Sequence, residues 1–183
     1  MSDTITFSLN GQSVEALPGE TIWQVADRQG IEIPHLCYSP SVDYRADGNC
    51  RACMVEIEGE RVLAASCIRT PSQGMVVNSA SDRARTARKM VFEMLTADQP
   101  ERETSHDPDS KFWNWAADIG VSESRLPRRG GPSVDQSHPA MRVNLDACIH
   151  CNLCVRACRE VQVNDVIGMA YRGHGAKIVF DFD

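Results

Sequence analysis

Eight cysteines in two separate groups of four constrain this 183-residue chain more than any other feature. The first group is Cys37, Cys50, Cys53 and Cys67; the second is Cys148, Cys151, Cys154 and Cys158. The long segment between Cys67 and Cys148 contains no cysteine. The sequence shows no export signal, and a reducing compartment keeps thiols available as metal ligands. We therefore expect two metal sites in a cytoplasmic protein rather than a disulfide framework.

Composition limits the partners of this chain. Its residues are 42% hydrophobic and 24% charged, which is enough for two small domains with modest cores. The net charge of −6 lacks the basic excess that nucleic-acid binding usually needs. No apolar run is long enough to cross a bilayer. We expect no nucleic-acid partner and no membrane span.

The first third of the chain has the pattern of strands around one helix. Alternating polar and apolar residues flank the turn signal Asn10-Gly11, which predicts a hairpin over residues 4–17. Thr21, with Gln24 three residues later, forms a capping box that opens a short helix. Further short strands are expected at residues 54–57, 61–65 and 75–78. The fold class is therefore α+β, with a β-grasp domain over residues 1–79.

A helix over residues 80–96 is expected to close this first domain. Its apolar residues recur at helical spacing and predict the buried face: Ala84, Ala87, Val91, Met94 and Leu95. Its basic residues are expected on the solvated face or beside it: Arg83, Arg85, Arg88 and Lys89.

The rest of the chain divides into a linker and a last domain. Residues 97–140 are polar and rich in Pro, Gly and Ser, with one short helix expected over residues 111–119. Trp113 and Trp115 are expected to anchor this segment by packing. In the last domain, residues 141–183, a hairpin is expected from strands at residues 166–171 and 177–182.

The first cysteine group has the form C-x12-C-x2-C-x13-C and predicts a [2Fe–2S] site. Iron prefers soft thiolate ligands, and four of them suit this cluster. The stretch Asp47-Gly48-Asn49 and the tight turn at Ala52 are expected to let backbone N–H groups reach the sulfur atoms, which raises the reduction potential. The alternative is a four-cysteine zinc site. Zinc sites usually pair two C-x2-C turns, whereas this group has one.

The second group is the C-x2-C-x2-C-x3-C run of bacterial ferredoxins. In that pattern Cys148, Cys151 and Cys154 ligate one [4Fe–4S] cluster, and Cys158 ligates a second cluster whose other ligands are missing from this sequence. We therefore expect a partial bacterial-ferredoxin-like domain at the front of a longer polypeptide. Alternatively, Cys158 is the fourth ligand of the first cluster and turns back from the start of the following helix.

Three segments around the first site resemble a known family of redox subunits: Pro34-His-Leu-Cys37, Gly48-Asn-Cys-Arg-Ala-Cys-Met-Val-Glu-Ile-Glu-Gly59 and Ser66-Cys67. The family includes the large iron–sulfur subunit of respiratory NADH dehydrogenase, the diaphorase subunit of NAD-reducing hydrogenases, and the alpha subunit of NAD-dependent, molybdenum-containing formate dehydrogenase. Residues 105–113 and 144–183 most resemble the formate dehydrogenase subunit. The resemblance covers essentially the whole chain.

One departure from the family lies in the linker. The NADH dehydrogenase subunit has a histidine and three cysteines between the two sites, which hold a further [4Fe–4S] cluster. This chain keeps only His106, and Ser110 and Trp113 stand at the first two cysteine positions. We therefore expect this third site to be degenerate and His106 to be structural.

The resemblance implies an electron-transfer role within a formate dehydrogenase. Electrons from the oxidation of formate to CO2 at a molybdenum bis-pterin centre would pass through the clusters toward flavin- and NAD-binding diaphorase subunits. The molybdenum cofactor would lie in the remainder of the enzyme. The sequence has no glycine-rich nucleotide fingerprint, so we expect no NAD, flavin or pterin site and no catalytic residue among these residues.

Other functions stay open at this point. The chain is alternatively a stand-alone iron–sulfur diaphorase subunit of an NAD-reducing hydrogenase or of an NADH dehydrogenase-like complex. A soluble electron carrier and a zinc-stabilised interaction module are further alternatives.

Overall fold

A computed structural model describes residues 4–40, 45–128, 130–131, 133–136, 139–140 and 142–180. The chain forms two compact units. Unit 1 comprises Met1–Ser39 and Arg45–Val91, and unit 2 comprises Pro40–Tyr44 and Phe92–Asp183. Met141, where the last predicted domain begins, lies outside the described residues.

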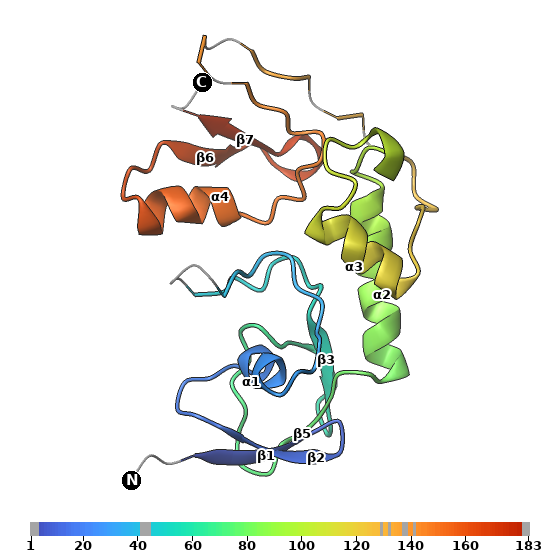
Figure 1. The fold of residues 1–183 in the computed structure, drawn as a ribbon, viewed down its shortest axis with the longest axis vertical. Coiled ribbons are helices and arrows are strands. Elements are labelled where there is room, and N and C mark those ends of the chain that lie inside the picture. Colours follow the sequence, from blue (N-terminus) through green and yellow to red (C-terminus); the bar gives the residue numbers. More distant parts are fainter. Residues whose placement is uncertain are drawn as a thin grey trace. The chain divides into compact units, whose positions relative to one another are not determined.

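Unit 1 is built on a mixed five-stranded sheet with the order β2-β1-β5-β3-β4 (Figure 1). The strands are β1 (Ile5–Leu9), β2 (Gln12–Ala16), β3 (Met54–Ile57), β4 (Ala64–Ala65) and β5 (Val76–Asn78). β1 pairs in parallel with β5, and the other neighbours are antiparallel. Asn10 and Gly11 adopt positive φ in the turn between β1 and β2, so the predicted first hairpin is confirmed.

The helix α1 (Ile22–Arg28) begins at the predicted capping box. The Thr21 hydroxyl oxygen accepts the Gln24 backbone N–H at 3.3 Å, and the Gln24 side-chain oxygen accepts the Thr21 N–H at 2.9 Å. The buried side chains of α1 join the inward-facing residues of the sheet in one core, which includes Phe7, Leu9, Ile22 and Val55. The predicted arrangement of strands around one helix is confirmed, and the structure adds that the sheet is mixed.

The strand predicted over residues 61–65 is shorter in the structure. Only Ala64 and Ala65 pair with β3, because the chain leaves β3 through a turn in which Glu60 donates its N–H to the Ile57 carbonyl oxygen. Gly59 adopts a φ of 79° in this turn. Residues 61–63, which were predicted to belong to this strand, therefore lie outside β4.

The helix α2 (Asp82–Thr96) forms as predicted, and Ala84 is buried as expected, but Ala87, Val91 and Leu95 are only partly buried. Ala84, Arg88 and Phe92 are buried at four-residue spacing, whereas Met94 is 50% exposed. Phe92 is fully buried and stacks on Phe112, with ring centroids 5.7 Å apart. A helix turns so that its largest apolar side chain is covered, and this places Arg88 on the same buried face. The prediction that Arg88 faces solvent is therefore wrong.

Unit 2 contains α3 (Lys111–Ile119), with the predicted bounds. Ser110 caps its first turn, and Gly120 ends it in the left-handed conformation with a φ of 76°. Trp113 is buried and Trp115 partly buried, so the predicted anchoring is confirmed most clearly for Trp113. A short 3₁₀ turn at Arg102–Thr104 precedes this helix.

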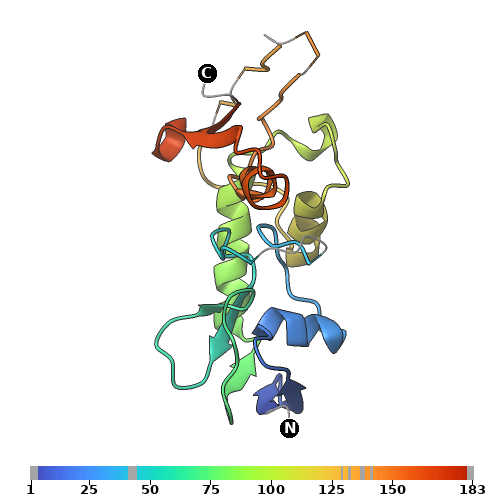
Figure 2. The same ribbon diagram turned by 90° about the vertical axis from the view of Figure 1, so that its left-hand side faces the viewer.

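The second part of unit 2 is a helical segment beside a hairpin. The segment begins with α4 (Leu153–Arg156) and continues as a π-helical turn over Ala157–Val161. The antiparallel hairpin of β6 (Ile167–Ala170) and β7 (Lys177–Phe180) lies next to α4 in both views (Figures 1 and 2). This confirms the predicted hairpin; residues 181–182 of its second strand lie outside the described residues. No helix in the described part of the chain has both the length and the apolar character that a membrane span requires.

Candidate metal centre

The four cysteines of the first group meet in unit 1. Cys37 lies in the loop after α1, Cys50 and Cys53 lie in the loop that leads into β3, and Cys67 lies two residues after the end of β4. Cys37, Cys53 and Cys67 are at most 3% exposed, and Cys50 is partly buried. None of the eight cysteines forms a disulfide bond.

Hydrogen bonds between thiols connect these four sulfur atoms. S–H groups of Cys50 and Cys67 donate to Cys37 and lower its pKa, while the same bonds raise the pKa values of Cys50 and Cys67. A hydrogen bond from Cys67 likewise lowers the pKa of Cys53 to about 7. The sulfur atoms thus share protons along the order Cys50–Cys37–Cys67–Cys53. Metal binding would replace these protons.

Backbone N–H groups also point at the sulfur atoms, as the sequence predicted. The N–H of Ala52 donates to Cys50 Sγ at 3.5 Å, and the N–H of Asn49 donates to Cys37. The N–H groups of Cys37 and Cys50 donate to each other's sulfur, both at 3.4 Å. Arg51 adopts a left-handed φ of 59°, which tightens the turn, and this special backbone was missed from sequence.

Gly48 is required by the same loop. It adopts a φ of 63°, and a Cβ atom at this position would lie 2.9 Å from Cδ1 of Ile68. A side chain there would therefore meet both backbone strain and a close contact. The glycine lets the loop carrying Cys50 approach the segment after Cys67.

Ser66 was also missed from sequence. Its side chain is completely buried, and its hydroxyl donates to the Cys53 carbonyl oxygen at 2.8 Å. The same hydroxyl proton is shared with the Cys53 sulfur, and this hydrogen bond helps to lower the pKa of the Cys53 thiol. A small polar residue directly before a cysteine was the only available signal.

The second cysteine group lies in unit 2 and is more open. Cys154 is exposed, Cys148 and Cys151 are partly buried, and Cys158 is buried. Partial burial raises the pKa of Cys154, and electrostatic interaction with Cys148 and Cys158 raises it further, so these three thiols are neighbours.

Cys158 does not stand at the start of a helix. It lies within the helical segment that began at Leu153, and its sulfur accepts the Val166 N–H at 3.4 Å. The helix therefore begins before Cys158, not after it.

The loop from Cys148 to Cys154 has an unusual backbone. His150 and Asn152 have positive φ values of 52° and 66°, separated by one residue. Alternating backbone conformations of this kind turn successive N–H groups toward one side and form concave sites for anionic groups. The His150 side chain connects this loop to the segment before β7, with Nε2 2.9 Å from the Ala176 carbonyl oxygen.

The residues expected to form a degenerate third site mainly make structural contacts. His106 is exposed. The Ser110 hydroxyl accepts the Trp113 N–H at 3.4 Å and so caps α3, and Trp113 packs edge-on against Phe112 with centroids 5.1 Å apart. The residues at the two family cysteine positions thus begin and anchor a helix.

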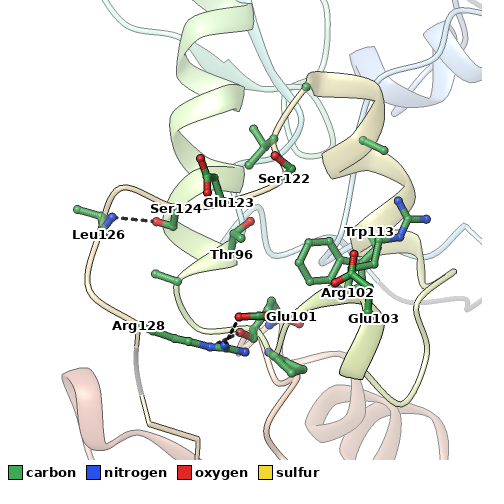
Figure 3. Close-up of a pocket in the computed structure, with 16 residues that line it drawn as sticks. Thr96, Glu101, Arg102, Glu103, Trp113, Ser122, Glu123, Ser124, Leu126 and Arg128 are labelled. Carbon is green, nitrogen blue, oxygen red and sulfur yellow. Dashed lines mark hydrogen bonds and ion pairs between the residues drawn. The ribbon is translucent and has the colours of Figure 1, made fainter.

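A pocket of about 690 Å³ lies beside this helix in unit 2 (Figure 3). Its lining includes Trp113, Thr96 and several charged side chains. Arg128 pairs with Glu101 at 3.3 Å, and Arg102 pairs with Asp109 at 3.6 Å, so both arginines already have a carboxylate partner. Neither cysteine nor histidine is among the described residues that line it.

The donor set of the first site suits an iron–sulfur cluster. It combines four converging soft sulfur atoms, burial that excludes water, and backbone N–H groups that stabilise negative sulfur. Among the described residues, no group of three His, Cys, Asp or Glu side chains is arranged around a single metal ion.

Comparison with known proteins agrees with this chemistry. Residues 2–82 match the family of 2Fe-2S iron-sulfur cluster binding domains. The chain is 33% identical over 174 residues to an NADH-quinone oxidoreductase subunit of Rhizobium meliloti, covering 92% of this chain and 20% of that protein. It is 31% identical to the NADP-reducing hydrogenase subunit HndD of Solidesulfovibrio fructosivorans, covering 98% of this chain and 32% of that protein.

Two further matches broaden the comparison. The putative formate dehydrogenase YrhE of Bacillus subtilis is 28% identical over 97% of this chain and 18% of its own length. A solved structure of an NAD+-reducing [NiFe]-hydrogenase superposes with a TM-score of 0.82 at 28% identity, covering 96% of this chain and 74% of that one. The chain spans only about a fifth to a third of the curated relatives. Residues 2–82 thus match a 2Fe–2S iron–sulfur cluster binding domain, in a chain similar along nearly its whole length to oxidoreductase subunits.

Proposed function

We propose that the chain is the iron–sulfur electron-transfer region of an NAD-dependent, molybdenum-containing formate dehydrogenase. The hydrogen-bonded set of four buried or partly buried thiols in unit 1 is the observation that carries the electron-transfer function. Similarity to a putative formate dehydrogenase over 97% of the chain supports the substrate. Electrons from formate oxidation would pass toward flavin- and NAD-binding partner subunits.

Cys37, Cys50, Cys53 and Cys67 would hold the [2Fe–2S] cluster, which supplies one-electron chemistry when bound. The protein contributes the four thiolates and the burial that keeps water away. It also contributes N–H groups, such as that of Ala52, which stabilise negative charge on sulfur. The match of residues 2–82 to a 2Fe-2S binding domain supports this assignment.

Cys148, Cys151 and Cys154 would ligate a [4Fe–4S] cluster in a partial bacterial-ferredoxin-like domain over residues 141–183. The C-x2-C-x2-C-x3-C spacing and the positive φ values of His150 and Asn152 support this proposal. We assign Cys158 to a second [4Fe–4S] cluster; the alternative is the fourth position of the first cluster.

The remaining cofactors belong elsewhere in this proposal. The molybdenum bis-pterin cofactor, the flavin and NAD would lie outside these residues, in other parts of the enzyme. Eight cysteines without a disulfide bond between them support a reducing compartment, and we place the enzyme in the cytoplasm.

A second candidate is the iron–sulfur diaphorase subunit of an NAD-reducing hydrogenase. The TM-score of 0.82 to an NAD+-reducing [NiFe]-hydrogenase chain, of which this chain covers 74%, favours it. The two candidates predict different metals and substrates in the complex purified through this chain. Molybdenum with formate-dependent NAD reduction supports the first, and nickel with hydrogen-dependent NAD reduction supports the second.

Iron and acid-labile sulfide analysis of the anaerobically purified chain tests the function common to both candidates. We expect iron and sulfide in the ratio of iron–sulfur clusters, and a [2Fe–2S] EPR signal after reduction. Stoichiometric zinc without iron would overturn the electron-transfer function and support the zinc-stabilised interaction module instead.

A further inference from the structure

Arg88 is a buried positive charge in unit 1 that fold formation alone does not account for. Its side chain is 8% exposed, although it belongs to a helix whose other arginines, Arg83 and Arg85, are exposed. No ion pair joins Arg88 to a carboxylate among the described residues. A buried cation normally requires a compensating negative charge, because its removal from water is costly.

The backbone contacts of Arg88 fix its guanidinium at one end of the sheet. The Nη2 group donates to the Ser79 carbonyl oxygen, and Nε donates to the Ala84 carbonyl oxygen at 3.3 Å. Ser79 is itself buried and bound to the Asn10 side chain, whose oxygen accepts the Ser79 N–H at 2.8 Å. The guanidinium is therefore held at the residue that directly follows β5.

The register of the sheet places this position at the cysteine end of β3. Glu56 pairs with Asn78, so continuing the antiparallel register by one residue sets Ser79 opposite Val55. Cys53 directly precedes β3, two residues before Val55. Ser79 and its bound guanidinium thus lie at the end of the sheet from which the cysteine ligands extend.

The electrostatic environment of Arg88 agrees with this placement. Burial lowers the pKa of the guanidinium and the positive charge of Arg85 lowers it further, while the negative charge of Cys53 raises it. An arginine stays protonated under these conditions, so its charge is permanent. Cys53 is the source of negative charge that acts on it.

We propose that Arg88 is the buried countercharge of the [2Fe–2S] site and raises its reduction potential. This inference rests on the proposed cluster ligation by Cys37, Cys50, Cys53 and Cys67. Four thiolates and two sulfides outweigh the charge of two ferric ions, and one-electron reduction adds a further negative charge. A fixed positive charge in a low-dielectric interior favours the more negative, reduced form. Arg88 acts through this field and is a potential-setting residue, not a ligand.

The test is a redox titration of the full chain with dithionite and mediators. The intensity of the [2Fe–2S] EPR signal measures the reduced fraction at each potential. Arg88→Gln removes the charge, Arg88→Lys keeps it, and Arg85→Gln removes an exposed charge from the same helix as a matched control. At a fixed ambient potential we expect about a tenfold lower reduced-to-oxidised ratio in Arg88→Gln, a shift of about 59 mV for a one-electron couple. Arg88→Lys and Arg85→Gln are expected to stay close to the wild type.

Two outcomes of the titration overturn the proposal. The first is an unchanged potential in a cluster-loaded Arg88→Gln chain. The second is an equal shift in Arg88→Lys, which would assign the effect to the lost guanidinium hydrogen bonds. A wild-type chain without any [2Fe–2S] signal would instead overturn the proposed function, so the two failures are distinguishable.

If Arg88→Gln binds little cluster, a second variant and a second measurement distinguish a missing charge from a folding defect. Arg88→Met keeps the apolar stem of the side chain. If neither neutral variant loads iron, circular dichroism of the cluster-free chains decides. Folded chains that take up no cluster support the need for the positive charge, whereas unfolded chains assign Arg88 a structural role alone and overturn the proposal.

Discussion

The hydroxyl of Ser66 donates a 2.8 Å hydrogen bond to the carbonyl oxygen of Cys53, at the point where β4 meets the beginning of β3. The Ser66 N–H donates to the same carbonyl oxygen at 3.1 Å. This completely buried serine therefore fixes the backbone of Cys53, while its hydroxyl also hydrogen-bonds the Cys53 sulfur. Two of the proposed ligands, Cys53 and Cys67, are thus positioned by the residue between β4 and Cys67.

Ser66→Ala is expected to lower the reduction potential of the first site. A hydrogen bond to a ligand sulfur stabilises the reduced cluster, and a bond worth about 1 kcal/mol corresponds to about 40 mV for a one-electron couple. Mediated redox titration followed by EPR measures the shift. Ser72→Ala, at an exposed serine of the same unit, is the matched control. A potential equal to that of the wild type would show that the hydroxyl bonds only to the backbone.

Cys53→Ser is expected to abolish the [2Fe–2S] absorbance and EPR signal and to leave the [4Fe–4S] signal intact. The two cysteine groups lie in different units, and a serine hydroxyl is a poorer iron ligand than a thiolate. Cys154→Ser is the reciprocal variant and should show the opposite pattern. Loss of both signals, or of neither, in either variant would contradict the assignment of two independent sites.

Ser110→Ala is expected to destabilise unit 2 without changing its iron content. The Ser110 hydroxyl caps α3, and removal of such a cap costs about 1 kcal/mol of unfolding free energy. Chemical denaturation followed by tryptophan fluorescence measures the loss, because Trp113 lies in the first turn of this helix. Ser122→Ala, at an exposed serine, is the control. A fall in bound iron in Ser110→Ala would mean that the third site of the family still binds metal.

Glu20 provides a pH-dependent contribution to the stability of unit 1. Burial opposes ionisation, but hydrogen bonds from Arg28 and from the Leu17 N–H, together with the Arg28 charge, hold the pKa of Glu20 below its ordinary 4.5. A lowered carboxyl pKa in the folded state contributes stability above the unfolded value, and this contribution is lost as the pH falls through the folded value.

Glu20→Gln keeps the hydrogen-bond acceptor and removes the charge. Its Tm is expected to be about 2 °C below the wild type at pH 7, because a partly exposed pair is screened by solvent. The difference should disappear well below pH 4.5. Glu15→Gln, at a neighbouring exposed carboxylate, serves as control. A difference that persists at low pH would show that charge is not its origin.

Elements with local start and stop signals were predictable from sequence. Ser110 and Gly120 mark both ends of α3, and Thr21 with Gln24 marks the beginning of α1, since these side chains bond to their own helix. Asn10-Gly11 likewise specified the first hairpin, because a two-residue turn of this type requires positive φ.

Features decided by distant contacts were not predictable. Five apolar residues suggested one face for α2, but the stacking of Phe92 on Phe112 rotated the helix and buried Arg88. Sequence spacing singled out the cysteines of the first site, whereas the roles of Arg51 and Ser66 depend on how separate loops meet. Periodicity reports which residues share a face, and only tertiary contacts determine which face is covered.

The parallel pairing of β1 with β5 also sets an order of events during synthesis. Ser8 pairs with Val76, and all four cysteines of the first group lie between these two strands in the sequence. The sheet that aligns their loops closes only after β5 has left the ribosome, because long-range pairing must overcome the entropy of closing the intervening chain. The first cysteine site is therefore completed late in the translation of its domain, only after β5 has been synthesised.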